Sequence, residues 1–304
     1  MPRKSFAYYA AYSILRFLAA LPRCVAFRLA RACTRIYGAL DRGHRRIGMT
    51  NLRIAFPEQT EQWRARVLRR SYANLGDLLV EISGFPQLRL PEVSRRVTYT
   101  EGSLDRYRAA KQKGRGLLFL TAHLGAWELL PFVHALYGYP LSFLVRPIDD
   151  PDVDKLLADY RTRSGNRLIP KKNALRAILR ALQNKQDVGF LIDQNVLPEE
   201  GVFVPFFGKD ACTTSGVAMI ALRTDAPVMA GFLLSLETPG HYQIHFGEEI
   251  PLSREGSLEE NIRSCTARFN REVEEIIRRN PAQWFWLHKR WKTRPPGGDE
   301  VRYS

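Results

Sequence analysis

Hydrophobic residues recur along the chain with two different periods, and the change from one to the other divides the sequence. Up to about residue 95 they repeat every three or four positions, which predicts helices. These are an apolar helix over 6–21, an amphipathic one after it and a longer one over 58–83. Beyond Arg95, short apolar runs alternate with helical stretches. Such alternation is typical of an α/β fold with a mostly parallel central sheet flanked by helices.

The alternating part contains six expected strands and four expected helices. The expected strands are 97–100, 116–121, 141–145, 187–192, 226–234 and 242–246. The expected helices are 126–137, 152–163, 173–184 and 215–222. We therefore divide the chain into membrane-associating helices over 1–45, an α/β domain over 46–295 and a loose tail over 296–304.

The apolar stretch at 6–21 is a poor candidate for a membrane-spanning helix. Arg16 interrupts it, and it is shorter than the roughly 20 residues that a spanning helix needs. The sequence after Leu21 also lacks the small-residue pattern of a signal-peptide cleavage site. We expect this segment to remain on the protein.

The next helix carries its charges on one face and apolar residues on another. The basic face holds Arg28, Arg31, Arg35 and Arg42, and the apolar face holds Val25, Leu29, Cys33, Ile36 and Leu40. This arrangement suits the cytosolic surface of an anionic membrane, with the apolar face among the acyl chains and the arginines at the phosphates. A helix packed on the domain with a solvated basic face is the alternative.

The overall charge points to acidic partners. Lys and Arg outnumber Asp and Glu by 46 to 31, for a net charge of +15. Residues 1–50 hold ten of these cations against one acid, Asp41, which places +9 at the amino-terminal end. Nucleic acid, anionic lipid and an acidic carrier protein all fit such an excess, and charge alone does not choose among them.

The cysteines and glycines carry no sign of a metal or nucleotide site. The four cysteines form no CxxC pair, which favours a reducing, cytosol-facing setting. No Cys/His group has zinc-site spacing, and no glycine-rich turn of the dinucleotide or P-loop type is present. We expect neither a metal nor a nucleotide cofactor.

The strongest candidate for chemistry is His123, which directly follows the apolar run 116–121. Ligands of open α/β sheets gather at the carboxyl ends of strands. Positions five apart on an ideal helix differ by about 140°, so His123 and Glu128 face each other only if His123 lies in the turn before the helix. Glu128 would then accept a hydrogen bond from one imidazole nitrogen and leave the other free as a base. A structural histidine is the alternative.

These residues resemble a known family. His123-x4-Glu128 resembles the HxxxxD/E motif of the lysophospholipid acyltransferase superfamily, and the form HLGAWE is similar to the lauroyl and myristoyl acyltransferases of lipid A biosynthesis. HxxxxE alone is a weak signal, but further matches follow in order from about residue 45 to 295. They are 51–57 (NLRIAFP), 144–147, 189–194, 201–208 with Thr213, 226–228 and 291–295.

The resemblance implies transfer of a fatty acyl group from a thioester to a hydroxyl of a membrane glycolipid, a lipid A precursor, at the cytosolic face of the inner membrane. His123 would be the general base and Glu128 its orienter, with no covalent intermediate and no cofactor. The donor, acyl carrier protein or acyl-CoA, stays open. The implied substrate contacts are Arg146, Asp193, Gln194, Gly208 and Thr213, with Phe206 and Phe207 walling an acyl-chain groove.

Other acceptors and other functions remain as alternatives. Ala126 stands where many members of this branch carry Asn, which leaves room for a lysophospholipid or a mannosylated phosphatidylinositol as acceptor. A lipid-binding scaffold and a nucleic-acid-binding module are the non-enzyme alternatives. The second would use the net charge and a basic-aromatic cluster, although the apolar amino terminus argues against it and we expect no nucleic acid. That cluster is Trp284, Trp286, Lys289, Arg290, Trp291 and Lys292.

Overall fold

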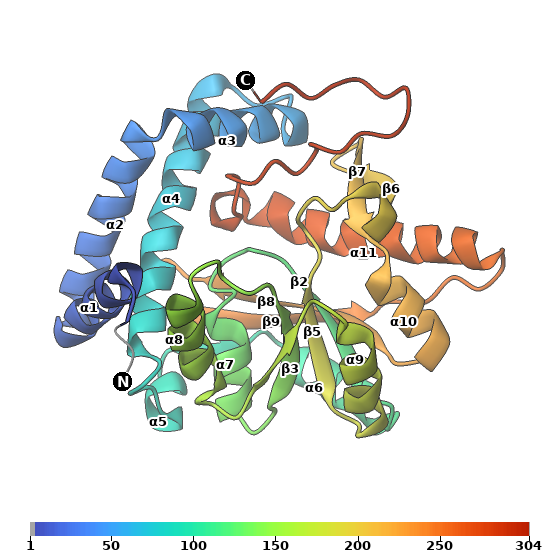
Figure 1. The fold of residues 1–304 in the computed structure, drawn as a ribbon, viewed down its shortest axis with the longest axis horizontal. Coiled ribbons are helices and arrows are strands. Elements are labelled where there is room, and N and C mark those ends of the chain that lie inside the picture. Colours follow the sequence, from blue (N-terminus) through green and yellow to red (C-terminus); the bar gives the residue numbers. More distant parts are fainter. Residues whose placement is uncertain (1–3, 304) are drawn as a thin grey trace.

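A seven-stranded sheet forms the centre of the computed structural model, which describes residues 4–303 (Figure 1). The strand order is β1-β9-β8-β2-β5-β3-β4, and every neighbouring pair is parallel except β8 and β9. The strands are β1 (Val97–Tyr99), β2 (Leu117–Thr121), β3 (Leu141–Val145), β4 (Arg167–Pro170), β5 (Asp187–Leu191), β8 (Val228–Ser235) and β9 (Tyr242–Glu249). The predicted α/β class is confirmed.

Side chains of the central strands alternate between two cores, one on each face of the sheet. Leu118 and Leu120 of β2 join one buried cluster, whereas Leu117 and Phe119 join the other. This is the period of two that a strand imposes. The first core packs against α9 (Ala174–Gln183), α10 (Gly216–Thr224) and α11 (Leu258–Arg279); the second packs against α6 (Ser103–Gln112), α7 (Leu129–Leu136) and α8 (Pro151–Thr162).

Four long helices precede the sheet: α1 (Phe6–Ala20), α2 (Arg23–Leu40), α3 (Arg42–Ala55) and α4 (Glu61–Gly84). The basic face expected of one helix is divided between two, because the Asp41 side chain accepts a hydrogen bond from the His44 N–H and caps α3. Helix α2 packs along α4, where Arg31 donates two hydrogen bonds to Asp77. Within residues 4–303, no helix is both long and apolar enough to cross a bilayer.

A small hairpin lies outside the main sheet. Strands β6 (Gly201–Phe206) and β7 (Lys209–Thr214) are antiparallel and are joined by Phe207 and Gly208. Both joining residues have positive φ, 53° and 72°, as a two-residue turn of the primed type requires. Short helices α5 (Leu90–Val93), η1 (Pro198–Glu200) and η2 (Pro281–Gln283) complete the fold.

Most expected elements are present within a few residues, and several were missed. They include α3, α6, β4, the β6–β7 hairpin and α11. The tail after Pro295, expected to be loose, is tied at Tyr303, whose hydroxyl donates to Asn51 Oδ1 and accepts from the Trp291 N–H. Residues 1–3 and 304, at the ends of the two predicted terminal segments, lie outside the described residues.

Candidate active site

The site forms where two neighbouring strands end. β2 and β5 are parallel, with Thr121 opposite Leu191, so the residues two positions further along each chain come together. His123 Nδ1 lies 2.9 Å from Asp193 Oδ1, and the His123 backbone N–H donates to Asp193 Oδ2 at 2.9 Å. The sheet thus joins two residues that are 70 positions apart in the sequence.

A third residue fixes the carboxylate. The indole N–H of Trp284 donates to Asp193 Oδ2 at 2.7 Å, and both side chains are buried. Burial alone would raise the pKa of Asp193, but the charge of His123 and three hydrogen bonds outweigh it and lower that pKa to about 2. Burial alone would lower the pKa of His123, but the charge and hydrogen bond of Asp193, with a smaller contribution from Glu128, raise it. The two groups therefore stabilise each other as an ion pair.

The other imidazole nitrogen is the one available for chemistry. With Nδ1 held by Asp193, the one hydrogen-bond partner of His123 Nε2 among residues 4–303 is the side-chain amide of Gln194, at 3.4 Å. The His123 side chain is 20% exposed, while Asp193 behind it is 2% exposed. In the neutral imidazole this arrangement sets the tautomer: Nδ1 carries the proton, and Nε2 presents a lone pair.

Glu128 does not form the expected hydrogen bond to His123. It accepts two hydrogen bonds from Arg161 of α8 instead, at 2.8 and 2.6 Å. The reason lies in the turn before α7. Gly125 has φ 62° and packs so closely on β8 that a Cβ would lie 2.1 Å from the Leu233 carbonyl oxygen. From this fixed point the chain enters α7 with Glu128 directed towards α8.

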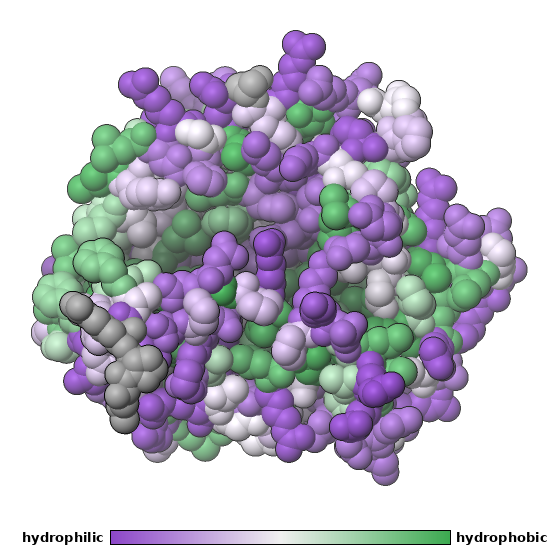
Figure 2. Space-filling model, viewed as in Figure 1, coloured by the Kyte–Doolittle hydropathy of each residue, from purple (hydrophilic) through white to green (hydrophobic). Residues whose placement is uncertain are grey.

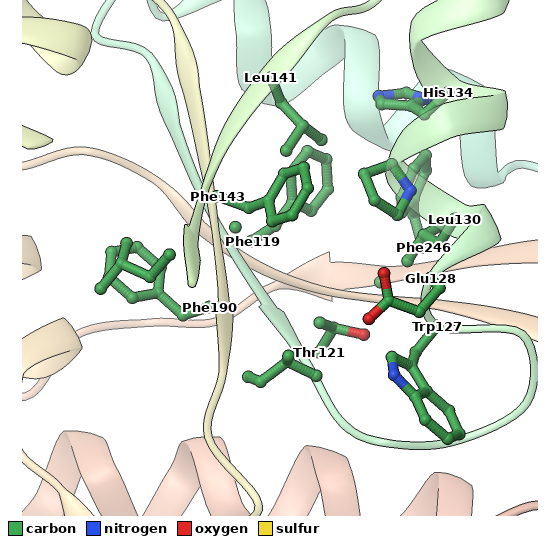
Figure 3. A pocket seen from close by; sticks show the side chains of 15 residues that line it. Phe119, Thr121, Trp127, Glu128, Leu130, His134, Leu141, Phe143, Phe190 and Phe246 are labelled. Atoms are coloured by element: carbon green, nitrogen blue, oxygen red, sulfur yellow. The ribbon is translucent and has the colours of Figure 1, made fainter. Parts of the chain in front are cut away.

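An apolar pocket opens beside the site, between α7 and strands β2, β3 and β5. Figure 3 shows Thr121, Trp127 and Glu128 at one end of it and Leu141 and His134 at the other. Long apolar walls with a few polar groups at one end suit an extended hydrocarbon chain. The walls are formed by Phe119, Leu130, Leu141, Phe143, Phe190 and Phe246.

The comparison with known families identifies the family to which this chain belongs. The family model described as bacterial lipid A biosynthesis acyltransferase matches residues 1–293. The chain belongs to this family. Its function is therefore acyl transfer to a lipid A precursor, as the resemblance implied.

Individual relatives in this acyltransferase family differ in the chain they transfer. The chain is 28% identical to the lipid A biosynthesis lauroyltransferase of Escherichia coli K12, over 93% of this chain and 90% of that protein. It is 28% identical to the palmitoleoyltransferase of the same organism, over 83% of this chain and 79% of that protein. It is 24% identical to the myristoyltransferase of that organism, over 86% of this chain and 80% of that protein.

Two other residues expected to contact substrate in this acyltransferase do not line the pocket. Thr213 is fully buried, and its hydroxyl accepts from Arg290 at 2.6 Å and from Asn270 at 3.0 Å. Gly208 lies in the hairpin turn. The two phenylalanines expected to wall the groove pack in the core against Trp284 and Trp286. These four residues support the hairpin and do not line the pocket.

Arg146 and Asp193 differ in how far they match their expected roles. Arg146 is exposed at the end of β3, on the same edge of the sheet as His123. Asp193 holds the imidazole instead of a substrate group or an arginine.

Sequence reasoning missed three residues that organise the site: Arg161, Trp284 as a partner of Asp193, and Arg290. The guanidinium of Arg290 is fully buried and donates to the carbonyl oxygens of Cys212 and Gln194. Burial lowers its pKa to about 10. All three tryptophans of the basic-aromatic cluster are also buried. The cluster is therefore packing, and it offers no rings on which bases could stack.

Among residues 4–303, no three His, Cys, Asp or Glu side chains gather in a way that could hold a metal ion.

Proposed function

We propose that this acyltransferase works by direct attack of the acceptor hydroxyl on an acyl thioester, with His123 as general base and Asp193 as its orienter. The observation that carries the proposal is the bond from His123 Nδ1 to the buried Asp193 carboxylate. It fixes the ring, leaves Nε2 as the proton acceptor and stabilises the imidazolium that forms during the reaction.

The step balances without a further reagent. The hydroxyl takes the place of the Gln194 amide at Nε2 and gives up its proton as its oxygen attacks the thioester carbon. The C–S bond then breaks, and the imidazolium returns the proton to the departing sulfur. General-base help of this kind is typically worth on the order of 10²–10⁴-fold.

The developing oxyanion has donors close by. The backbone N–H groups of Trp127 and Glu128 stand at the start of α7 and have no hydrogen-bond partner in the described part of the chain. Such groups stabilise negative charge without reorganising. The Arg161–Glu128 pair joins α7 to α8 at the pocket mouth. We propose that it positions the acyl chain and does not exchange a proton.

We further propose that α1 and α2 lie on the cytosolic face of the inner membrane. Ten large apolar or tyrosine side chains of these helices are exposed, with Phe6, Ile36 and Leu40 above 60%. Figure 2 shows hydrophobic side chains gathered over this side of the molecule. Arg28 and Arg35 are exposed beside them, whereas Arg31 is paired with Asp77 and belongs to the α2–α4 contact. An apolar face bordered by arginines suits an anionic bilayer.

The chemistry is tested by His123→Ala, purified in detergent with its fold checked by circular dichroism. Thiol release from an acyl thioester and acylation of a lipid A precursor, followed by mass spectrometry, should fall at least about 100-fold, because the general-base help of the imidazole is lost. More than about a tenth of wild-type turnover in a folded variant would show that His123 is not the base. Offering a lysophospholipid in parallel tests the alternative acceptor.

The membrane contact is tested by replacing Arg28 and Arg35 with Glu. Binding to vesicles of mixed neutral and anionic lipid should weaken by about 10-fold or more, since each cation near such a surface contributes roughly 1 kcal/mol. The matched control is Arg263→Glu with Arg271→Glu, two exposed arginines of α11. Unchanged sedimentation of the first variant, or an equal loss in both, would contradict the proposal.

A further inference from the structure

A second pocket lies between three of the amino-terminal helices, where α3 meets α2 and α4 (Figure 1). Each helix contributes one arginine to its lining: Arg35 of α2, Arg45 of α3 and Arg69 of α4. No Asp or Glu is among the residues that line it. Three cations from three helices therefore surround one hollow without an acid to balance them, which points to an anionic ligand.

The guanidinium groups of these arginines are available to such a ligand. All three side chains are exposed. Within residues 4–303 none of them pairs with a carboxylate, and their one hydrogen bond runs from Arg45 to the Ala39 carbonyl oxygen at 3.1 Å. The nearby acid Asp41 is engaged by the backbone N–H and the imidazole of His44 in the cap of α3. Arginine binds phosphate oxygens through two parallel N–H groups, so a phosphate suits this arrangement.

The pocket also holds a buried hydroxyl without a partner. Tyr72 lines the pocket and is 2% exposed, and its hydroxyl makes no hydrogen bond within the described part of the chain. Burial, with the charge of Asp41, raises the pKa of Tyr72 to about 12, so the hydroxyl keeps its proton and is a donor. Helix α2 fixes the ring, because a Cβ on Gly38 would lie 2.6 Å from it. A buried donor without an acceptor is costly, and a ligand oxygen in this pocket removes that cost.

The other walls are apolar, which favours a lipid over a free anion. Met49 and Leu68 also line the pocket. Ile36 and Leu40, at the same end of α2, are 62% and 76% exposed. Cations beside apolar surface suit an amphiphile, whose phosphate meets the arginines and whose hydrocarbon covers the apolar side chains. Inorganic phosphate leaves that apolar surface uncovered.

This pocket is separate from the catalytic centre. Tyr72 and Asn74 are two positions apart on α4, so their side chains point about 200° apart around the helix. The Asn74 amide donates to the Gly125 carbonyl oxygen in the turn after His123, at 3.1 Å. Tyr72 lines the pocket on the other side of the helix. A lipid bound here is therefore neither the acyl donor nor the acceptor at His123.

We propose that this pocket binds the headgroup of an anionic membrane phospholipid, with the phosphate on Arg35, Arg45 and Arg69 and one oxygen accepting from the Tyr72 hydroxyl. The proposal rests on the proposed membrane contact of α1 and α2, which it extends from a general surface to a specific site. It does not depend on the chemistry at His123. A bound lipid joins α2, α3 and α4 to one point of the bilayer and so fixes how the protein sits on it.

The test counts phosphatidylglycerol molecules bound to the detergent-solubilised full chain by native mass spectrometry. In Arg45→Gln with Arg69→Gln, the affinity of the first lipid should fall about 10- to 100-fold, because two charge-assisted contacts are lost. Tyr72→Phe removes only the unpaired hydroxyl and should weaken the same step by about 3- to 10-fold. A merely structural tyrosine would leave lipid affinity unchanged. The control, Arg263→Gln with Arg271→Gln on α11, should bind as wild type does.

Thermal unfolding gives a second readout. Added phosphatidylglycerol should raise the Tm of wild type and of His123→Ala, since a ligand of the folded state stabilises it, and should not raise that of the Arg45→Gln, Arg69→Gln variant. No saturable first site in wild type, or equal affinity in wild type and this variant, would overturn the proposal. So would inorganic phosphate that binds as tightly as the lipid, or a variant that binds phospholipid normally but has a raised KM for the lipid A precursor, which would make the pocket an acceptor site.

The binding measurement uses no membrane and no turnover, so its outcome is separable from the proposed function. Phospholipid binding that is lost in the variant supports the pocket even if Arg28→Glu with Arg35→Glu leaves vesicle binding unchanged, a result that would count against the broader membrane contact alone. The same holds if His123→Ala retains its turnover, which would count against the proposed base alone.

Discussion

Two loops meet at His123, and each supplies one carboxylate in a different environment. Asp193, after β5, is 2% exposed and receives hydrogen bonds from an imidazole and an indole. Glu128, at the end of the turn after β2, is 17% exposed and is held by Arg161. The residue close to His123 in sequence is paired elsewhere, and the distant one is its partner. The spacing of a motif therefore identifies residues that matter without saying which of them touch.

The sheet explains this difference. A residue in the loop after β2 meets the loop after β5 because those strands are hydrogen-bonded neighbours. Glu128 is carried away from the imidazole because the turn is pinned on both sides, by the Gly125 N–H to the Gln283 carbonyl and the Ala126 N–H to the Leu233 carbonyl. Asp193 thus has the position of an orienter and Glu128 that of a wall of the pocket.

Of the substitutions that test the two carboxylates, Asp193→Asn should reduce turnover most. An asparagine at this position can present its NH₂ group to Nδ1, which favours the wrong tautomer, and it cannot stabilise the imidazolium by charge. Turnover should fall by about 10³–10⁴-fold with the acceptor KM little changed. Single-turnover acyl transfer in folded variant enzyme measures it. A loss of less than about tenfold would remove Asp193 from the mechanism.

Glu128→Gln should have a smaller effect. The amide keeps the shape of the side chain but loses the charge that holds Arg161, so the pocket mouth shifts and turnover falls by about 10-fold, at most 100-fold. Arg161→Lys, which keeps the charge but not the two-fold hydrogen bonding, is the matched variant and should fall by a similar factor. If Glu128→Gln is as damaging as Asp193→Asn while Arg161→Lys is not, Glu128 acts on the reacting atoms.

The sequence was sufficient for the fold class and for the ends of the strands that hold the site. Buried strands such as β2 and β5 are continuous apolar runs, so both were visible, and so was the polar residue after each. Helix α11 also has a start signal in the sequence, because Ser257 and Glu260 form a capping box. β4 is short, and three of its four residues are charged, proline or partly exposed, so its pattern gave no strand signal.

Contacts between distant segments were beyond sequence reasoning. Nothing in the sequence near Trp284 indicates that its indole reaches Asp193, or that Arg290 is buried against the hairpin. Thr213 was assigned to the substrate because it belongs to a matched motif, but its hydroxyl serves Arg290. A motif in this family therefore marks both the site and the core that supports it.

The smallest expected effect is a shift of the pH profile, and it ranks the two carboxylates directly. His123 must be neutral to accept a proton, so kcat/KM falls as pH drops through its pKa. Burial lowers that pKa, but Asp193 and, less strongly, Glu128 raise it above its usual 6.5. Removing either negative charge lets the opposing effect of burial show, so the acidic limb should move to lower pH. The shift should be large in Asp193→Asn and small in Glu128→Gln. Mass-spectrometric rates between about pH 5 and 9, across the usual range for histidine, measure both. A limb that moves to higher pH, or that moves further in Glu128→Gln than in Asp193→Asn, would mean that Glu128 is the stronger electrostatic partner of the imidazole.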